Sequence, residues 1–387
     1  MVVYFGRVNL SIVLTFLQNE YGYSKAALGI VAAGFFGTYA AGQLINGVLG
    51  DRFNPRYFVS LGLAASGLAN IMFGVSRSLP AMFLFWSING YFQSMLWGPM
   101  VRLVSEYSPP EKLHKGLIFL ISSTIIGYFF SYAVLGQITV LIHWKWAFWA
   151  PGLLLLIMAF LWFWAFRGNT RKSAPVSGKS EDTAARGGLW GILDFLLRTR
   201  LWVVALVCVL EGLVKEGLTL WSPTILSESQ SLGMDKALLI MTLLPLLNLP
   251  VLVLSGWVNK LFRHHEKPTL FFFLALSFVF AVMLKFTLRD TLLWMSIALF
   301  SLIAAAFAIN NLLISFVPVN FQKEQRVSTA AGFLDCATYA GAAISGPLVG
   351  LLADRSGWKS VVDGWIMVTV MAIILTIFTR DYKTKKQ

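Results

Sequence analysis

Residues 201–225, LWVVALVCVLEGLVKEGLTLWSPTI, form a continuous apolar segment that three charged side chains interrupt, Glu211, Lys215 and Glu216. At 1.5 Å of rise per residue, a helix of this length crosses the ~30 Å hydrocarbon core of a bilayer. A charge near the centre of such a helix costs at least about 2.5–3.5 kcal/mol, so it usually faces a watery cavity or a partner. The segment therefore predicts a membrane-spanning helix with a polar functional site at mid-depth.

The composition extends this prediction to the whole chain. Of 387 residues, 57% are hydrophobic and only 13% are charged, which excludes a soluble globular protein. Continuous apolar runs of about 20 residues indicate an all-α integral membrane protein and not a transmembrane barrel, whose strands alternate over about ten residues. The twelve predicted spans are 1–17, 26–49, 57–76, 80–104, 116–138, 147–166, 201–225, 236–262, 269–287, 291–317, 328–352 and 361–379.

The first span is short, about 25 Å at 1.5 Å per residue. We expect that the first turns of this helix are missing from the sequence and that the true start lies upstream. A cleaved signal peptide is the rival interpretation, but no basic segment precedes the apolar run and no small-residue cleavage site follows it.

The basic residues predict the orientation in the membrane. With the amino terminus inside, the cytoplasmic loops and tail hold 21 of the 31 Lys and Arg residues and the opposite loops hold 8. This is the positive-inside bias, so the net charge of +13 indicates topology and not nucleic-acid binding. Cys208 and Cys336 both lie in predicted spans without metal-ligand spacing, and we expect neither a disulfide nor a bound metal.

One long polar segment divides the chain into two sets of six spans. Residues 167–200 begin with RGNTRKSAPVSGKSEDTAARGG, a flexible linker, and end with LWGILDFLLRTR, which predicts a short helix at the cytoplasmic interface. The predicted units are an N-terminal bundle (1–166), this linker, a C-terminal bundle (201–380) and a basic cytoplasmic tail (381–387).

Traces of repetition relate the two bundles. Gly47 and Gly256 are 209 residues apart, and the pattern Gly136-x7-Trp144-Lys145 recurs 214 residues later as Gly350-x7-Trp358-Lys359. The two offsets agree within a few residues, which favours a duplication. Parallel repeats of six helices place substrate sites at the interface between the halves, near the middle of the membrane.

Charged residues inside the spans are the candidate site. Arg7 and Lys215 are 208 residues apart, so they occupy equivalent positions and are predicted to face each other across the repeat axis. A structural ion pair of Lys215 with Glu211, four residues earlier, is the alternative for the lysine. Glu211, Glu216 and Asp335 are predicted either to balance charge as fixed counter-ions or to exchange protons.

Polar and aromatic side chains in the same spans could complete a pocket. Each alone is more often an interhelical contact than a ligand. The candidates that we assign to substrate binding besides Arg7 and Lys215 are Asn9, Tyr39, Gln43, Gln93, Trp97, Trp221 and Tyr339.

The loop GVLGDRFNPR, residues 47–56, resembles the signature of the major facilitator superfamily between helices 2 and 3. Within that superfamily, GRVNLS (6–11), GYFQSMLWGP (90–99), KEGLTLWSPTIL (215–226) and STAAGFLDCATYAG (328–341) are similar to the organophosphate:phosphate antiporters, which include glycerol-3-phosphate and hexose-phosphate transporters. The resemblance covers nearly the whole chain. It implies a fold of twelve helices in two pseudo-symmetric bundles.

The resemblance also implies roles for individual residues. Arg7 and Lys215 would hold the phosphate or another anionic group, since Arg offers a planar fork and Lys a point charge. Asn9, Tyr39 and Tyr339 would line the pocket. Four residues of the loop signature would form a cytoplasmic gate that breaks when that side opens: Gly47, Asp51, Arg52 and Arg56.

Departures from the family pattern leave the chemical class of the transported compound open. Gln43 stands where the antiporters have a lysine, the histidine of helix 5 in the glycerol-phosphate branch is absent, and Ser94, Leu96 and Gly98 alter the helix 4 motif. Two intramembrane cations thus face three carboxylates. A carboxylate, a zwitterion or a neutral sugar derivative would fit as well as a phosphate ester.

The sequence predicts a secondary transporter in the bacterial inner membrane, with both termini cytoplasmic. It moves a small organic anion, a phosphorylated metabolite by preference, by alternating access in exchange for phosphate or with a proton. The alternatives are a proton-coupled symporter of a carboxylate or sugar derivative and a sugar-phosphate sensor that does not transport. We expect a monomer that has no cofactor, binds no nucleic acid and is not an enzyme.

Overall fold

A computed structural model describes residues 1–107, 123–167, 194–263, 265–321 and 326–379. The first half of the chain comprises α1 Val2–Tyr21, α2 Lys25–Arg52, α3 Pro55–Val75, α4 Leu79–Gln93, α5 Trp97–Tyr107, the π-helical turn η1 Ser131–Leu135, α7 Gly136–Leu141 and α8 Trp146–Ala165. The second half comprises α11 Leu201–Ser229, α12 Met234–Met241, α13 Leu244–Leu261, α14 Glu266–Thr287, α15 Leu292–Asn311, η2 Leu312–Phe316, α16 Val317–Val319 and α17 Val327–Ile377.

Local sequence signals explain where the first helices begin and end. Gly22 ends α1 in a left-handed conformation (φ 68°), which a glycine adopts without steric cost. The Ser24 hydroxyl accepts a hydrogen bond from the Ala27 amide and caps α2. The short turn between them makes α1 and α2 antiparallel neighbours in the chain.

Eight helical segments of the described residues are long and apolar enough to cross a membrane. The last of them, 329–377, covers nearly all of both predicted spans 328–352 and 361–379, and the helical path breaks between the two at Gly357 (φ 74°, ψ 176°). The predicted span 80–104 is divided into α4 and α5, and the predicted span 236–262 into α12 and α13. The start of the span predicted at 116–138 lies outside the described residues.

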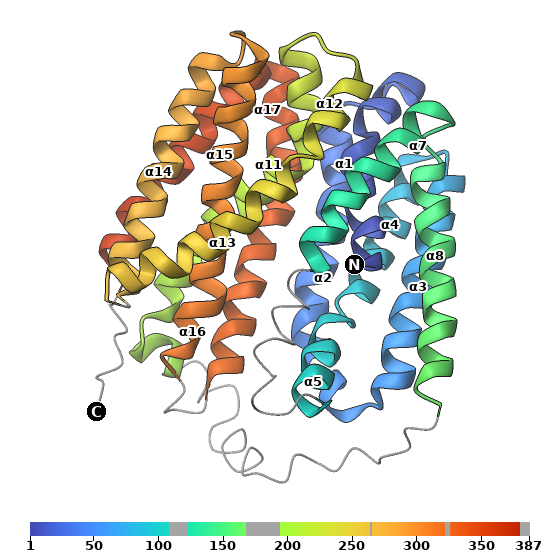
Figure 1. Cartoon of the computed structure of the whole chain (residues 1–387), viewed down its shortest axis with the longest axis horizontal. Helices are drawn as coiled ribbons and strands as arrows, with labels where there is room; N and C mark the ends of the chain where they lie inside the picture. The colour runs from blue at the N-terminus through green and yellow to red at the C-terminus, as the bar shows by residue number, and fades with distance from the viewer. Residues whose placement is uncertain (108–122, 168–193, 264, 322–325, 380–387) are drawn as a thin grey trace.

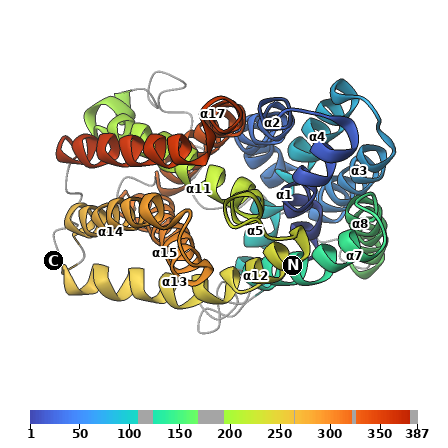
Figure 2. The same ribbon diagram turned by 90° about the horizontal axis from the view of Figure 1, so that it is seen from above.

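The helices form two groups, one from each half of the chain (Figure 1). Seen from above, α1 to α8 lie on one side and most of α11 to α17 on the other, while α12 reaches across to pack against η1 and α7 (Figure 2). The helices α1, α2, α11 and α17 lie near the middle. We call the end with the turn at 22–24 the hairpin face, and the opposite end, where α8 ends and α11 begins, the linker face. The flexible linker, the first residues of the interfacial helix and the tail predicted at 381–387 lie outside the described residues.

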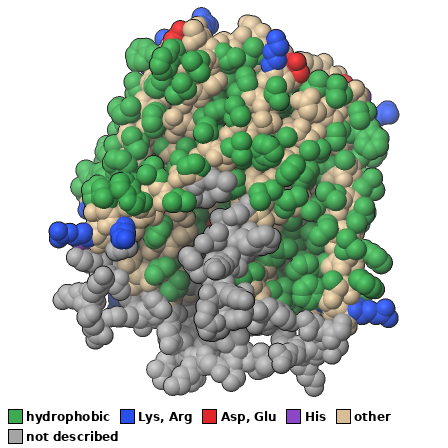
Figure 3. Space-filling view, in the orientation of Figure 1, with side chains coloured by type: hydrophobic (Ala, Val, Ile, Leu, Met, Phe, Trp, Pro, Cys, Tyr) green, Lys and Arg blue, Asp and Glu red, His purple; other side chains and the backbone are tan. Residues whose placement is uncertain are grey.

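The surface agrees with a membrane setting. Figure 3 shows hydrophobic side chains over the middle of the molecule, Lys and Arg side chains at both ends, and Asp and Glu side chains at the upper end. One cluster of buried apolar residues includes Leu10 and Leu14 of α1 and Leu218 and Trp221 of α11, so the two groups share a core. The contact between the halves is where a site between them would lie.

Candidate functional site

Arg7 projects from the second turn of α1 into a cage of aromatic rings. Its guanidinium carbon lies 4.6 Å from the ring centre of Tyr39, 5.4 Å from that of Phe35 and 5.3 Å from that of Tyr339. The Arg7 Nη2 donates a 2.7 Å hydrogen bond to the Tyr339 hydroxyl. Tyr339 belongs to α17, so this bond joins the two halves. In the described part of the chain Arg7 has no carboxylate within ion-pair distance, which leaves its guanidinium without an ion-pair partner.

Lys215 of α11 has a different environment. Its Nζ lies 3.1 Å from Glu216 Oε1, and both side chains are almost fully buried, at 6% and 8% exposed. Its ammonium also lies 5.6 Å from the ring centre of Phe307. The ion pair of Lys215 is therefore with Glu216 and not with Glu211, the partner considered from the helical spacing. Glu211 instead accepts a 3.3 Å hydrogen bond from Asn310 Nδ2, and its Oε1 has no hydrogen-bond partner.

A small cavity of about 30 Å³ lies between α1, α2 and α11. Arg7 and Ser11 line it from α1, Phe35 and Phe36 from α2, and Glu216 from α11. A volume of this size holds a few water molecules at most, whereas ligand pockets usually measure about 300–1,000 Å³. The halves are thus closed around the centre in this state, and a metabolite would need them to part.

The predicted pair Arg7 and Lys215 is brought to one region, and Glu216 links the two. Glu216 lines the cavity of Arg7 and forms the ion pair with Lys215. Asp335 of α17 interacts electrostatically with both cations and with Glu216. The centre therefore contains Arg7, the Lys215–Glu216 ion pair beside it, and the further carboxylates Glu211 and Asp335.

Other predicted residues divide between this centre and distant positions. Tyr39 and Tyr339 belong to the cage, with their rings 4.6 Å apart, and Gln43 interacts with Tyr39. Trp221 is fully buried and contacts Trp358, nearer the hairpin face. Trp97 begins α5 and is 39% exposed, outside the residues that line the cavity.

Asn9 and Gln93 lie in a polar network inside the first half. Asn9 Nδ2 donates to Asn70 Oδ1 at 2.8 Å and to the Ala147 carbonyl at 3.0 Å. Gln93 Nε2 donates to the Gly6 carbonyl at 2.9 Å. Both side chains are buried between helices of the same bundle, which favours a structural role over contact with a substrate.

The predicted cytoplasmic gate falls at the end of α2 on the linker face. Gly47, Asp51 and Arg52 are part of α2, but their side chains lie outside the described residues. Arg56 is described: its Nε donates a 2.9 Å hydrogen bond to the Phe163 carbonyl of α8. Its guanidinium also lies 4.0 Å from the Phe163 ring centre. This contact is within the first half.

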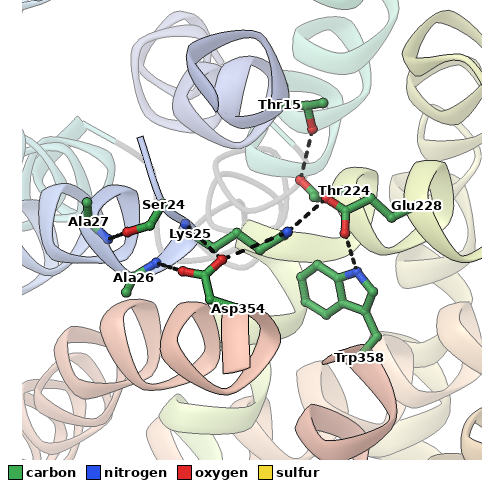
Figure 4. A network of polar contacts seen from close by, with 9 residues as sticks. All are labelled: Thr15, Ser24, Lys25, Ala26, Ala27, Thr224, Glu228, Asp354 and Trp358. Carbon is green, nitrogen blue, oxygen red and sulfur yellow. Dashed lines mark hydrogen bonds and ion pairs between the residues drawn. The ribbon is translucent and has the colours of Figure 1, made fainter. Parts of the chain in front are cut away.

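Polar contacts near the hairpin face join the halves, and the sequence did not single out their residues (Figure 4). Lys25 Nζ lies 3.1 Å from Glu228 Oε1 and 4.0 Å from Asp354 Oδ1. The Asp354 carboxylate also accepts hydrogen bonds from the amides of Lys25 and Ala26, the first residues of α2, at 3.2 and 2.9 Å. A carboxylate of one half thus caps a helix of the other, where the helix dipole favours negative charge. We call these contacts of Lys25, Glu228 and Asp354 the hairpin-face lock.

Below this lock, α2 and α17 touch backbone to backbone. A Cβ added to Gly29 would lie 2.2 Å from the Gly346 carbonyl oxygen, and one added to Gly346 would lie 2.5 Å from that of Gly29. Neither position has room for a side chain. Small residues at such a crossing permit the close approach that the lock requires.

Comparison with known proteins agrees with this architecture. The family model described as Major Facilitator Superfamily matches residues 1–331. A structure titled as a bacterial homolog of the human lysosomal transporter Spinster, inward-facing and occupied, superposes with a TM-score of 0.78 at 13% identity, covering 98% of this chain and 94% of that one. The D-xylose-proton symporter gives a TM-score of 0.75 at 15% identity, covering 100% and 97%.

Curated relatives are similar over almost the full chain. The glycerol-3-phosphate transporter of Bacillus subtilis is 28% identical over 97% of this chain and 88% of its own length. A probable hexose phosphate transport protein of Chlamydia trachomatis is 26% identical over 97% and 87%. The membrane sensor protein UhpC of Salmonella typhimurium is 24% identical over 85% and 77%. The resemblance to the organophosphate:phosphate antiporter group is confirmed, and the chain belongs to the Major Facilitator Superfamily, whose fold has twelve membrane-spanning helices.

Proposed function

We propose that this protein carries a small organic anion, with a phosphorylated metabolite as its cargo, through the membrane by alternating access. The observation that carries the proposal is Arg7: a cation at the junction of the two halves, lining the cavity, with no carboxylate in ion-pair distance among the described residues. A guanidinium without an ion-pair partner at mid-membrane attracts an anion and can bind a phosphate or carboxylate through two hydrogen bonds. Relatives named for hexose phosphate, glycerol-3-phosphate and phosphoglycerate support a phosphate group on the cargo.

In this proposal the charge balance near Arg7 changes when the cargo binds. The cargo anion replaces Tyr339 as the partner of Arg7 and draws Lys215 away from Glu216. Both cations then contact the anion from opposite halves, and the carboxylates Glu211, Glu216 and Asp335 balance charge when the site is empty. The halves rock about this centre, the hairpin-face lock parts, and the two halves separate at that face.

We further propose that the linker face is cytoplasmic and that the membrane is the bacterial inner membrane. The excess of Lys and Arg in the loops of that face supports this orientation. The conformation described here is then closed toward the outside by the hairpin-face lock.

A direct test uses the purified protein in liposomes loaded with inorganic phosphate. We expect external [32P]phosphate to exchange with the internal pool, and hexose 6-phosphates or glycerol 3-phosphate to compete while the parent sugar or glycerol does not. Equal competition by phosphorylated and unphosphorylated compounds would overturn the proposed cargo class.

Two observations favour alternative functions, a proton-coupled symporter and a sensor that does not transport. Three carboxylates lie around two cations, which favours proton coupling, and uptake that follows a pH gradient and ignores internal phosphate would select that mechanism. The similarity to a membrane sensor favours binding without transport. Saturable binding of a sugar phosphate with no flux in either direction would select the sensor.

A further inference from the structure

A large hollow lies on the hairpin face of the second half, away from the central cavity. It measures about 630 Å³ and lies where the ends of α11 and α14 meet the turn at Gly357 in α17. This volume is within the range of ordinary ligand pockets. Its lining residues are Glu228, Ser229, Lys285, Phe286, Leu288, Arg289, Ser356, Gly357, Trp358 and Lys359.

The duplication shows that this hollow is a built feature of one half. In the second half, Trp358 Nε1 donates a 2.8 Å hydrogen bond to Glu228 Oε2. In the first half, Trp144 Nε1 donates to Glu20 Oε2. Glu228 follows Glu20 by 208 positions and Trp358 follows Trp144 by 214, the offsets already seen for Arg7 with Lys215 and for Gly136 with Gly350. The two indole–carboxylate pairs are therefore equivalent.

The space around the two pairs is filled differently. In the first half, the rings of Tyr21 and His143 pack on Trp144 at 6.1 and 5.8 Å between centroids. At the same offsets the second half has Ser229 and Gly357. A Cβ added at Gly357 would meet nothing within 4 Å. Replacing two rings by a hydroxymethyl group and a hydrogen removes the filling, which accounts for the hollow.

The charges that line the hollow favour an anion. Lys285 is paired with Asp363 at 2.6 Å, and Glu228 is already engaged by Lys25 and Trp358. Arg289 and Lys359 are exposed and form no hydrogen bond or ion pair with any other described residue. The cavity thus presents the guanidinium of Arg289 and the ammonium of Lys359, while Lys285 and Glu228, the other charged lining residues, are already paired.

We propose that this hollow is a second anion-binding site that takes a phosphate or phosphate monoester group, held by Arg289 and Lys359. The phosphate chemistry of the ligand rests on the proposed function, whereas the existence of an anion site does not. Glu228 and Trp358 belong both to the hollow and to the contacts around the hairpin-face lock. A bound anion would therefore lie beside the seam that must part before cargo reaches Arg7.

The test counts bound phosphate on the full-length protein in phosphatidylcholine nanodiscs, with [32P]phosphate as the probe. We expect two sites in the wild type and one in Arg289→Gln/Lys359→Gln, whose affinity in the hollow falls at least about tenfold. The matched control is Arg77→Gln/Lys145→Gln, which removes two cations from the same face of the first half and should keep both sites. An unchanged count in Arg289→Gln/Lys359→Gln would overturn the proposal.

A variant that fills the hollow without changing its charge tests whether the anion binds inside it. Ser229→Tyr introduces the ring that Tyr21 supplies in the first half and removes no charge, so it should abolish the second site while Ser229→Ala retains it. Binding that survives in Ser229→Tyr, with an unchanged melting temperature, would show that the hollow does not hold the anion.

Phosphate counts in a variant of the central site distinguish failure of this proposal from failure of the proposed function. Arg7→Gln should lose the central phosphate and keep the one in the hollow; if it keeps both and still exchanges phosphate, the central site fails and the hollow stands. In nanodiscs of phosphatidylglycerol, loss of only the second phosphate would identify a lipid headgroup as the source of the anion. Retention of both would identify the soluble phosphate compound.

Discussion

The two halves of the molecule carry equivalent cations in different electrostatic settings. Arg7 lies among aromatic rings and donates to Tyr339, whereas Lys215, 208 positions later, forms a buried ion pair with Glu216. The duplicated scaffold therefore fixes where a cation stands, and its immediate neighbours decide how much charge it offers. The first half brings a cation without an ion-pair partner to the centre, and the second brings the Lys215–Glu216 ion pair together with the carboxylates Glu211 and Asp335.

The hairpin face shows a similar difference between the two halves. The Trp–Glu hydrogen bond is kept in both halves, but Tyr21 and His143 close the space in one, and the other remains open beneath Arg289 and Lys359. Equivalent Trp–Glu pairs in the two halves therefore have different surroundings.

The largest effect is expected where the ion pair of the second half is broken. Lys215→Gln leaves Glu216 buried without a partner, which should destabilise the protein by about 3–5 kcal/mol and abolish exchange. Lys215→Gln/Glu216→Gln removes both charges and should restore the melting temperature while exchange stays about 10- to 100-fold below wild type, because a charged ligand of the anion is lost.

The double variant decides between the two roles of Lys215. Wild-type exchange by Lys215→Gln/Glu216→Gln would mean that Lys215 only neutralises Glu216, and the anion would then be held by the first half alone.

A smaller effect is expected at the hairpin-face lock. Asp354→Asn weakens charge-assisted hydrogen bonds to the start of α2, each worth about 1.5–3 kcal/mol, and should shift the population toward separation at this face. Spin labels at positions 77 and 355, with Cys208 and Cys336 replaced by alanine, report the distance between the halves.

The control for the lock is Asp363→Asn, which breaks the ion pair with Lys285 inside the second half. It should leave the distance distribution unchanged. If Asp354→Asn gives the same distribution as this control, the lock does not hold the halves together.

The smallest effect on transport is expected in the polar network of the first half. Asn9→Ala removes the donor to Asn70 Oδ1 and the Ala147 carbonyl, so it should destabilise the protein by about 1–3 kcal/mol. Exchange per folded molecule should remain near that of wild type. A normal melting temperature with lost exchange would assign Asn9 to the cargo site, as the family resemblance implies.

Much of the fold follows from one-dimensional patterns. Apolar runs predict most helices within a few residues of their observed bounds, although α1, α4 and α11 are not among the eight helical segments long and apolar enough to cross a membrane. The repeated offsets predict the equivalence that the Trp–Glu pairs display in the structure. The breaks between α4 and α5 and inside α17 depend on local backbone geometry at residues 94–96 and at Gly357, which composition does not specify.

The site was predictable only in part. Helical geometry alone rotates successive residues by about 100°, so Asn9 and Arg7 point in nearly opposite directions, and this signal could have separated them. The same 100° rotation explains why Glu216 lines the cavity whereas Lys215, one residue earlier on α11, does not. Asp354 caps a helix that begins 329 positions away, a contact that no local pattern encodes.

The central claim is that Arg7 holds the anion, and exchange of [32P]phosphate by Arg7→Gln in phosphate-loaded liposomes tests it most directly. Equal melting temperatures would confirm folding, and Arg7→Lys would show whether charge alone suffices. We predict no measurable exchange for Arg7→Gln and partial exchange for Arg7→Lys, which keeps the charge but loses the planar fork. Exchange at the wild-type rate by folded Arg7→Gln would contradict the account.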